Sequence, residues 1–356
     1  MKNTDRNIGI DTLRVIACFM IVGIHSTPGF MNNGTIHDYI NAILKSIYHV
    51  GLPVFFIISG YYALQARVKN IAQWYTKRVT RLLVPFIIIS FIHFLYFKNT
   101  SLSTSLILEY LKLSITGIMN ISIHFWFVYV IIAIYIAMPF ISIVVSKLSA
   151  NASVITLLAI ISMQTLNSNT YLTGYFGFNL SADTNIGIFV WPLYFVLGGL
   201  YYKSETIIKK YNYNLILLVS FLVTALMTMS TPNIKGIDFH QFDVNGSMIL
   251  YSSSLFLIFL NMKTKVSPKT ASAIGKLSGL TYLIYLSHVM VLKFLYNNFP
   301  ETTTYLQGHN LHIFITITAF IITAMIAFIV SPTINAISKK IENSVYKLYH
   351  LPIANQ

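Results

Sequence analysis

Cysteine, acidic residues and metal-binding patterns are all scarce in this sequence. The single cysteine, Cys18, excludes an intrachain disulfide and a cysteine-based zinc site. No His-x-x-x-His pair and no cluster of carboxylates occurs, so we expect no metal cofactor. Charged residues make up only 10% of the chain. We find no internal repeat and no low-complexity tract, which argues against repeat proteins and disordered proteins.

Apolar residues are abundant by contrast. They make up 55% of the 356 residues, and the mean hydropathy is +0.67. They form repeated runs long enough to cross a bilayer, which predicts an all-α fold, a polytopic transmembrane helical bundle of about ten spans. The expected spans are residues 9–27, 47–65, 83–97, 124–145, 152–166, 187–202, 213–230, 246–262, 277–297 and 310–332.

Positive charge is distributed unevenly around these spans. The chain carries 24 Lys and Arg residues against 10 Asp and Glu, a net charge of +14. Most of the basic residues fall in loops on one side, the side of both termini, which predicts cytoplasmic termini and no nucleic-acid partner. Residues 101–120 contain Glu109 and Lys112 and are expected to form an interfacial helix rather than a span.

The first hydrophobic helix carries Asp11, Arg14 and His25. Arg14 and His25 are eleven residues apart, which at about 100° per residue places them within roughly 20° of one another on one helix face and about 16 Å apart along the axis. Ionisable groups within a span favour a protein interior or a wet cavity, so this face is a candidate wall of an active site. The alternative is an Asp11–Arg14 ion pair near the membrane surface, with His25 capping the far end.

Two further stretches could line the same cavity. In the second span, Pro53, Ser59 and Gly60 favour either a cavity wall or ordinary close helix packing. Arg78 and Arg81, three residues apart, would share a face at the cytoplasmic entry of the third span, and their planar guanidinium groups suit phosphate oxygens. Anchoring of the helix at the membrane surface explains such arginines equally well.

Histidines mark the expected outer side. His124 and Trp126 stand at the outer entry of the fourth span, where an aromatic belt is typical. With His25 and His49, His124 would form a histidine-rich rim that could position a polar acceptor. His288 lies deeper, in the ninth span. For His49, His93 and His288 the common role of a lone buried histidine, a hydrogen bond between helices, remains the alternative.

Six motifs, in this order along the chain, resemble those of the integral-membrane acyltransferase family 3. The resemblance covers essentially the whole chain, and the first two motifs in combination are the most specific. The motifs are Asp11-x-Leu-Arg14 followed by His25, Phe55-Phe56-x-x-Ser59-Gly60, Arg78-x-x-Arg81-x-x-x-Pro85, His124-x-Trp126-Phe, Phe195-x-x-Gly198-Gly199 and Tyr285-Leu-Ser-His288.

The resemblance implies a bacterial, multi-pass protein of the cytoplasmic membrane. Members of the family take an acyl group, commonly acetyl, from cytosolic acyl-CoA and place it on a sugar or another cell-envelope acceptor across the membrane. The resemblance also implies that His25 and Arg14 are essential. Residues 1–356 are expected to form a single membrane domain without the soluble C-terminal hydrolase-like domain of some members. Such a chain completes the transfer itself or hands the acyl group to a separate partner.

Taken together, the residues and the resemblance predict an acyl-CoA site at the cytoplasmic mouth. Arg78 and Arg81, together with Arg14, would bind the phosphates, and the pantetheine arm would run along the second span past Ser59. Such an arm can bridge the axial gap between Arg14 and His25.

The expected catalytic group is His25. An imidazole with an unperturbed pKa of about 6.5 is suited to remove the proton of an acceptor hydroxyl as the oxygen attacks the thioester. Asp11 would orient Arg14. The acceptor, an envelope glycan or a lipid-linked sugar, would contact the residues of the outer side, which are His124, Trp126, His49 and His288.

A transporter is the competing hypothesis. The same intramembrane polar residues could line a path for protons or for a substrate such as a surface polysaccharide or a small polar solute. The chain contains no obvious inverted repeat or pair of broken helices that would favour transport. Binding of acetyl-CoA distinguishes the two functions.

Overall fold

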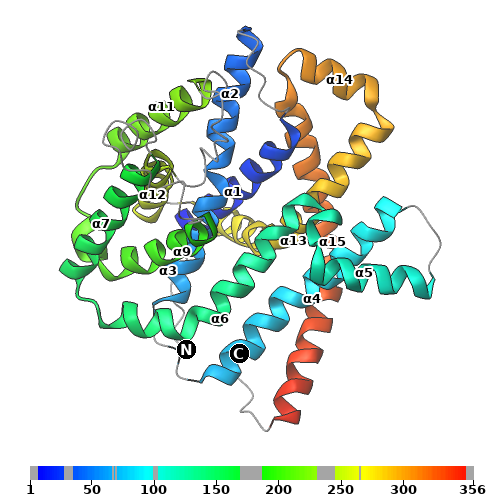
Figure 1. The fold of residues 1–356 in the computed structure, drawn as a ribbon, viewed down its shortest axis with the longest axis horizontal. Coiled ribbons are helices and arrows are strands. Elements are labelled where there is room, and N and C mark those ends of the chain that lie inside the picture. The colour runs from blue at the N-terminus through cyan, green and yellow to red at the C-terminus, as the bar shows by residue number, and fades with distance from the viewer. Residues whose placement is uncertain are drawn as a thin grey trace.

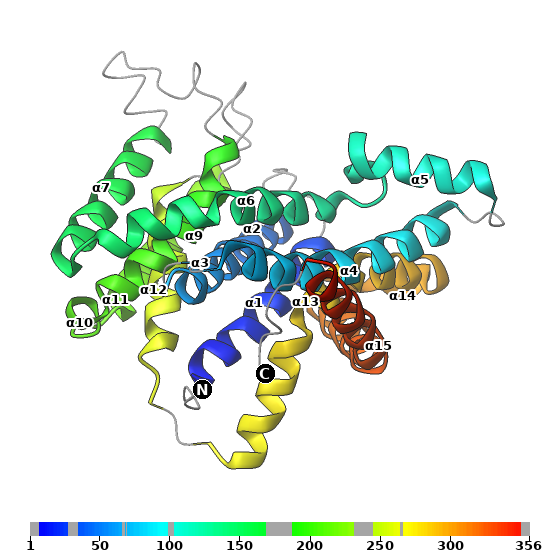
Figure 2. The same cartoon turned by 90° about the horizontal axis from the view of Figure 1, so that it is seen from below.

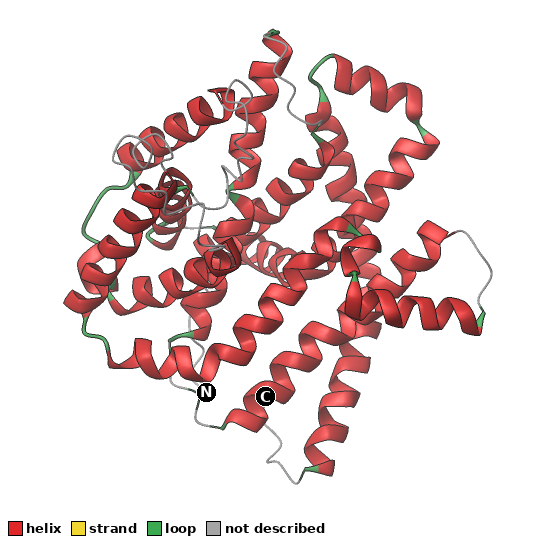
Figure 3. Ribbon diagram, in the orientation of Figure 1, coloured by secondary structure: helices red, strands yellow, loops and turns green. Residues whose placement is uncertain are grey.

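The computed structural model describes residues 7–27, 35–65, 68, 70–98, 103–168, 187–230, 245–263 and 266–349. Every regular element within these ranges is helical, and none is a strand (Figures 1 and 3). The expected all-α class is therefore confirmed for the described part of the chain. The expected outer loops at residues 167–186 and 231–245 lie almost entirely outside it.

The helices follow one another along the chain with short connections. In order they are α1 Ile8–Ser26, α2 Ile36–His49, α3 Gly51–Ala63, α4 Ile71–Lys98, α5 Thr104–Thr116, η1 Ile118–Asn120, η2 Ile123–Phe125, α6 Trp126–Lys147, α7 Ala150–Ser168, α9 Gly187–Lys203, α10 Glu205–Ile208, α11 Asn214–Ser230, α12 Gly246–Leu260, α13 Pro268–Asn298, α14 Pro300–Gly308 and α15 His312–Leu348.

A helix occupies each of the ten expected spans. In the part of the chain that the structure describes, six helical stretches are long and apolar enough to cross a membrane, and shorter apolar helices accompany them. Large apolar side chains cover the outside of the bundle; Phe140 and Ile329, for example, are 74% and 73% exposed, which suits lipid and not water. The chain is thus a multi-pass membrane protein, while the number of ten spans and the cytoplasmic termini stay predictions.

Two helices, α4 and α15, extend beyond the apolar runs from which they were predicted. α4 begins at Ile71, well before the expected start at residue 83, and α15 continues to Leu348. The polar segments at both places are helical, because residues near the membrane surface continue the backbone hydrogen bonding of the span. For α4 this extension matters, since it places Arg78 and Arg81 on a regular helix instead of in a loop.

α1 lies at the centre of the bundle. It packs against α2, α3, α12, α13 and α15, whereas α5 and α7 lie at the periphery (Figures 1 and 2). Ile10, Leu13, Ala17 and Val22 of α1 are fully buried. The helix that carries Arg14 is therefore a wall of the protein interior.

The ends of the first and last helices can be placed relative to the rest. Asn7 donates a hydrogen bond from Nδ2 to the carbonyl of Leu260, 3.3 Å away, so α1 begins where α12 ends. The hydroxyl oxygen of Tyr346 in α15 lies 3.5 Å from the carbonyl oxygen of Gln73, at the start of α4. These contacts agree with the expected order of helix ends, in which all of them lie on one side.

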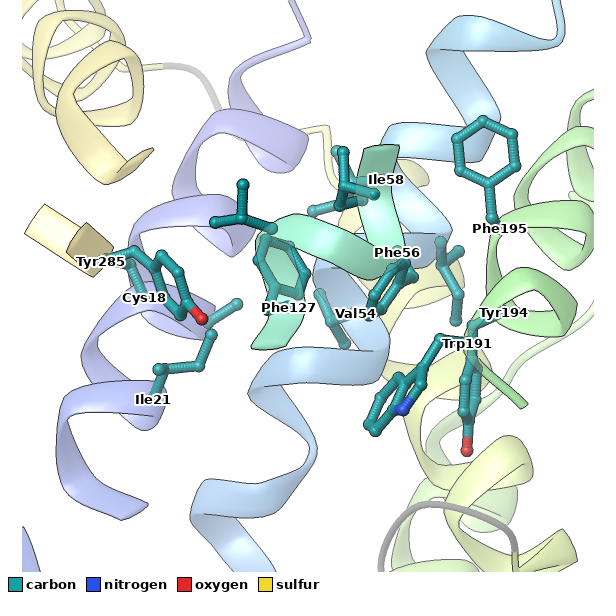
Figure 4. Packing of buried hydrophobic residues seen from close by; sticks show 14 of the residues in the cluster. Cys18, Ile21, Val54, Phe56, Ile58, Phe127, Trp191, Tyr194, Phe195 and Tyr285 are labelled. Carbon is teal, nitrogen blue, oxygen red and sulfur yellow. The ribbon is translucent and has the colours of Figure 1, made fainter. Parts of the chain in front are cut away.

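Glycines allow α3 and α9 to pack closely. A Cβ at Gly60 would lie 1.7 Å from the Phe195 carbonyl oxygen, and a Cβ at Gly198 would lie 2.1 Å from the Ile57 carbonyl oxygen. The close-packing interpretation of Gly60 is thus correct. Beside this contact, the ring of Phe56 lies 5.0 Å from that of Phe127 and 5.1 Å from that of Trp191 between centroids (Figure 4).

The replacement Gly60→Ala should destabilise the protein. An added methyl group would collide with backbone atoms that cannot move alone, and overpacking of this kind costs about 1–3 kcal/mol. Gly279→Ala is the matched control, because a Cβ there meets nothing within 4 Å and alanine is the better helix former. Thermal unfolding of the two variants in detergent should show a lower midpoint for Gly60→Ala alone; equal midpoints would contradict the close-packing explanation.

Candidate functional site

A pocket of about 650 Å³ opens between α1, α3, α4, α6 and α13. Among the described residues, its charged lining consists of four cations and contains no carboxylate. The inner part of the lining is apolar and aromatic. The lining residues are Arg14, Ile21, Phe55, Ser59, Trp74, Lys77, Arg78, Arg81, Leu82, Phe127, Ile131, Tyr135, Thr281, Tyr282 and Tyr285. Such a pocket suits an anion that carries a less polar extension.

The first turns of α4 supply three of the cations. Arg78 and Arg81 both line the pocket and are exposed at its mouth, as expected for two arginines on one helix face. Lys77 joins them and is half-buried. The sequence analysis did not name Lys77 as a site residue. Its position four residues before Arg81, on the same helix face, was the available signal. These three side chains form a cationic entrance to the pocket, in addition to any anchoring of α4 at the membrane surface.

Arg81 also faces an acidic group from another helix. Its Nε lies 3.8 Å from Oε2 of Glu342 in α15, and Glu342 in turn accepts a hydrogen bond from the hydroxyl of Tyr346 at 3.0 Å. The Arg81 side chain remains 63% exposed. At this distance and exposure the ion pair is weak, and the guanidinium still has room for a second anion.

The fourth cation, Arg14, comes from α1. Its Nη1 lies 3.5 Å from Oδ1 of Asp11 and donates to Oγ of Ser278 at 3.1 Å, while the Ser278 hydroxyl donates to Asp11 at 2.7 Å. The Arg14 side chain is 27% exposed and lines the pocket. Arg14 therefore forms the expected pair with Asp11 and also lines the cavity. Ser278 is a partner that sequence reasoning missed.

Ser59 and Phe55, one turn apart in α3, line the same pocket. Ser59 is half-buried. The structure thus places Ser59 on the path from the cationic entrance towards the interior, where the second span was expected to pass.

Four histidines from separate elements meet beyond the inner end of the pocket. Between ring centroids, His25 of α1 lies 5.1 Å from His288 of α13 and 6.1 Å from His124 of η2. His124 lies 4.8 Å from His288 and 5.6 Å from His93 of α4. We call these four residues the histidine cluster. His288, expected to lie deeper than the others, is part of it, and His93 was not singled out because a lone histidine in an apolar run carries no specific signal.

The hydrogen bonds of the histidine cluster fix His124 most firmly. Its Nδ1 lies 2.8 Å from Oγ of Ser122, and its Nε2 lies 3.2 Å from the carbonyl of Leu286 in α13. Nδ1 of His288 lies 2.5 Å from the carbonyl of Tyr285, while its Nε2 is buried without a hydrogen-bond partner among the described residues. A buried ring nitrogen without a partner is costly, so this atom is a candidate contact for a bound polar group.

His25 differs from the other members because it is only half-buried. Its described contacts are the ring contacts to His124 and His288, and no described residue forms a hydrogen bond with its ring nitrogens. An imidazole in this state can accept a proton from a bound hydroxyl.

Tyr285 separates the pocket from the histidine cluster. It lines the pocket, its hydroxyl donates to the backbone carbonyl of His124, and its ring centroid lies 5.3 Å from that of His124. On α1 the pocket reaches Ile21, one turn before His25. The described lining therefore includes Arg14, Ile21 and Tyr285 but does not include His25.

The two remaining expected acceptor residues make other contacts. Nδ1 of His49 lies 2.8 Å from the carbonyl of Lys45 in its own helix. The Trp126 ring packs against Trp191, with centroids 5.1 Å apart. Within the described ranges, no three His, Cys, Asp or Glu side chains are placed to hold a metal ion.

Comparisons with known proteins identify the family of the chain. A family model described as an acyltransferase domain matches residues 7–336. A protein of Staphylococcus aureus (strain MRSA252), named "Probable poly-beta-1,6-N-acetyl-D-glucosamine export protein", is 24% identical over 310 residues, which cover 82% of this chain and 85% of that protein. An amino-acid racemase of Enterococcus faecalis is 27% identical over 307 residues, 80% of this chain and 41% of the longer racemase. No solved structure matches the chain significantly.

Proposed function

Because this chain belongs to the integral-membrane acyltransferase family 3, we propose that it moves an acyl group, acetyl being the first candidate, from cytosolic acyl-CoA to a hydroxyl group of a cell-envelope sugar or polysaccharide. The observation that carries the proposal is the pocket itself. The charged residues of its described lining are all cations, and it leads from an exposed mouth towards the histidine cluster. We place the protein in the cytoplasmic membrane of a bacterium, with residues 1–356 acting as one membrane domain.

The donor would enter at the cationic end. Coenzyme A carries a phosphorylated nucleotide at one end and a long, weakly polar pantetheine arm at the other. Lys77, Arg78 and Arg81 provide charge for the phosphates, and Arg14 extends this charge inward. The arm would pass Ser59 and bring the thioester to the apolar inner end of the pocket.

The transfer itself needs one base. His25 would take the proton of the acceptor hydroxyl while its oxygen bonds to the thioester carbonyl carbon. The carbon–sulfur bond then breaks, and the sulfur leaves with a proton returned by the imidazolium, so the products are an ester and free CoA. Since His25 does not line the pocket, side chains at its inner end, of which Tyr285 is one, would have to shift for the thioester to reach His25.

The acceptor would approach the histidine cluster from the expected outer side. His124 and His288 present ring atoms beside His25, and His49 and Trp126 would bind parts of the acceptor farther away. The Staphylococcus aureus relative is named for a poly-N-acetylglucosamine, whose repeating unit carries free hydroxyl groups, and this favours a surface glycan as the acceptor class. A lipid-linked sugar, or a separate protein that receives the acyl group, are the other acceptors compatible with this route.

Removing the negative charge of Glu342 should strengthen donor binding. In Glu342→Gln the glutamine can still accept from Tyr346, but Arg81 no longer faces a carboxylate 3.8 Å away. Since exposed pairs of this kind contribute up to about 1 kcal/mol, we expect roughly a two- to five-fold lower Kd for acetyl-CoA at low salt. Glu301→Gln, a charge change on exposed α14, serves as the control. An unchanged or higher Kd in Glu342→Gln would remove Arg81 from the phosphate site.

Polysaccharide export is the competing function, because the Staphylococcus aureus relative carries that name. An exporter needs a path wide enough for a sugar chain, whereas the described lining of the pocket ends at Ile21, Phe127 and Tyr285. The packed rings beyond them favour a site for a small reacting group over a conduit for a polymer.

Calorimetric titration of the purified protein with acetyl-CoA tests the proposal directly. Micromolar binding that competes with free CoA is the expected result. Mass spectrometry of envelope glycans should then show O-acetyl groups that depend on the protein. Absence of acetyl-CoA binding together with intact export of the glycan would establish transport instead.

A further inference from the structure

One face of α4 combines the three cations of the pocket entrance with an indole ring. Trp74, Lys77, Arg78 and Arg81 follow the spacing i, i+3, i+4, i+7, which places all four on one side of the helix. All four line the pocket. A phosphate site alone needs no aromatic group, so the position of Trp74 at this charged mouth calls for a further explanation.

The surroundings of Trp74 leave part of the ring available. The residue is half-buried and lines the cavity. The Arg78 guanidinium carbon lies 5.9 Å from the indole centroid, at the outer limit of a cation–π contact. Tyr135 of α6, which also lines the pocket, lies 5.5 Å away at an interplanar angle of 77°, so it meets the indole edge to face instead of covering it in parallel. Tyr75 lies 5.2 Å away at 81°, so neither neighbouring ring is parallel to the indole, and the Arg78 guanidinium lies over it at a distance that leaves room for adjustment.

We infer that Trp74 is the stacking platform for a purine base, and that the entrance of the pocket is a subsite for the phosphorylated adenosine end of the donor. Aromatic side chains stack on nucleobases, while cations on the same helix face bind the attached phosphates. In this arrangement Trp74 orients the nucleotide, and Lys77, Arg78 and Arg81 take its phosphates. The inference rests on the proposed function, because it assigns the nucleotide part of acyl-CoA to these residues.

The entrance subsite explains selectivity between donors. A thioester carried on phosphopantetheine alone, as on a carrier protein, has the same arm and one phosphate but no adenosine. A protein that stacks the base should prefer the CoA form. Trp74 is then a specificity-determining residue that lies far from the histidine cluster and takes no part in proton transfer.

Calorimetry with two ligands tests the subsite. CoA and 4′-phosphopantetheine are titrated into the detergent-purified wild-type protein and into Trp74→Ala, Trp74→Phe and Tyr96→Ala. The last is a control on the same helix, outside the pocket, at a site 38% exposed. Trp74→Ala should raise the Kd for CoA by about ten-fold or more, with less than a two-fold change for phosphopantetheine. Trp74→Phe should recover most of the CoA affinity, and Tyr96→Ala should bind both ligands like the wild type.

Fluorescence supplies a second measurement on intact protein. The chain has three tryptophans, and Trp126 and Trp191 pack against one another away from the entrance. Stacking of adenine on Trp74 should quench the emission of the wild type on addition of CoA, and Trp74→Phe should lose this quenching while it still binds CoA.

The outcomes separate the two proposals. If the wild type binds CoA no more tightly than phosphopantetheine, or if Trp74→Ala weakens both ligands equally, the stacking subsite is wrong and the acyl-CoA donor stands. If the wild type does not bind CoA at all, the donor assignment fails and the subsite fails with it. Should Trp74→Ala not fold, the affinity ratio of the two ligands in Trp74→Phe and the loss of quenching decide the matter.

Discussion

The variant His25→Ala is expected to lose nearly all acyl transfer and to retain its fold and its affinity for acetyl-CoA. General base catalysis contributes about 10²- to 10⁴-fold in rate, so kcat should fall by roughly that factor. Stability should change little, because the His25 ring is half-buried and forms no hydrogen bond with the described residues. Transfer of labelled acetyl to an isolated glycan acceptor, measured beside calorimetry with acetyl-CoA, separates the loss of chemistry from a loss of binding.

His309→Ala is the matched control for this experiment. That histidine is exposed at the end of α14 and lies outside the pocket and the histidine cluster. It should transfer acetyl at the wild-type rate. A folded His25→Ala protein with substantial transfer would show that another group takes the proton.

Replacement of Arg14 by glutamine is expected to have the second largest effect. Arg14 lines the pocket and also contacts the buried Asp11. Its Nη1 lies 3.5 Å from Oδ1 of Asp11 and 3.1 Å from Oγ of Ser278. A charged hydrogen bond to a phosphate or thioester group contributes about 1.5–3 kcal/mol, so kcat/KM should fall roughly 10- to 100-fold. Part of any loss could reflect a weaker fold, because the Asp11 carboxylate would lose its guanidinium partner.

The double variant Asp11→Asn/Arg14→Gln distinguishes these two causes. It removes both charges together, so its thermal midpoint should return towards that of the wild type. Its transfer activity should stay as low as that of Arg14→Gln, because the positive charge on the cavity is still absent. Recovery of activity in the double variant would show that Arg14 acts only through the stability of α1.

Much of the membrane architecture was predictable from the chain alone. Long apolar runs identify helices because the bilayer leaves few other backbone conformations, and a helix lies at each of the ten expected spans. The common face of Arg78 and Arg81 also followed from helical spacing, since it depends on local geometry. Helix ends were less predictable, because polar residues at the membrane surface continue a helix without an apolar signal; α4 and α15 are the examples.

The residues of the candidate site were likewise predictable only in part. Sequence reasoning singled out Arg14, His25, Ser59, His124 and His288, each from its residue type within an apolar or aromatic run or from a motif. It missed Lys77, Trp74, His93, Ser278 and Tyr285 as members of one arrangement. Tyr285 stands in the motif that contains His288, and Lys77 shares a helix face with Arg81, but neither pattern shows which other helix lies beside them. Their proximity depends on how α1, α4 and α13 pack.

The amino-acid sequence by itself determined that this is a helical membrane protein and which polar side chains a lipid environment would force inward. Its periodicity placed residues on helix faces, because face and spacing are properties of a single helix. Only the tertiary structure decided that the cations of α4 and Arg14 of α1 line one pocket, and that histidines of α1, α4, η2 and α13 meet beyond it. Contacts between helices depend on side-chain packing between segments far apart in the chain, and a single sequence does not display that packing.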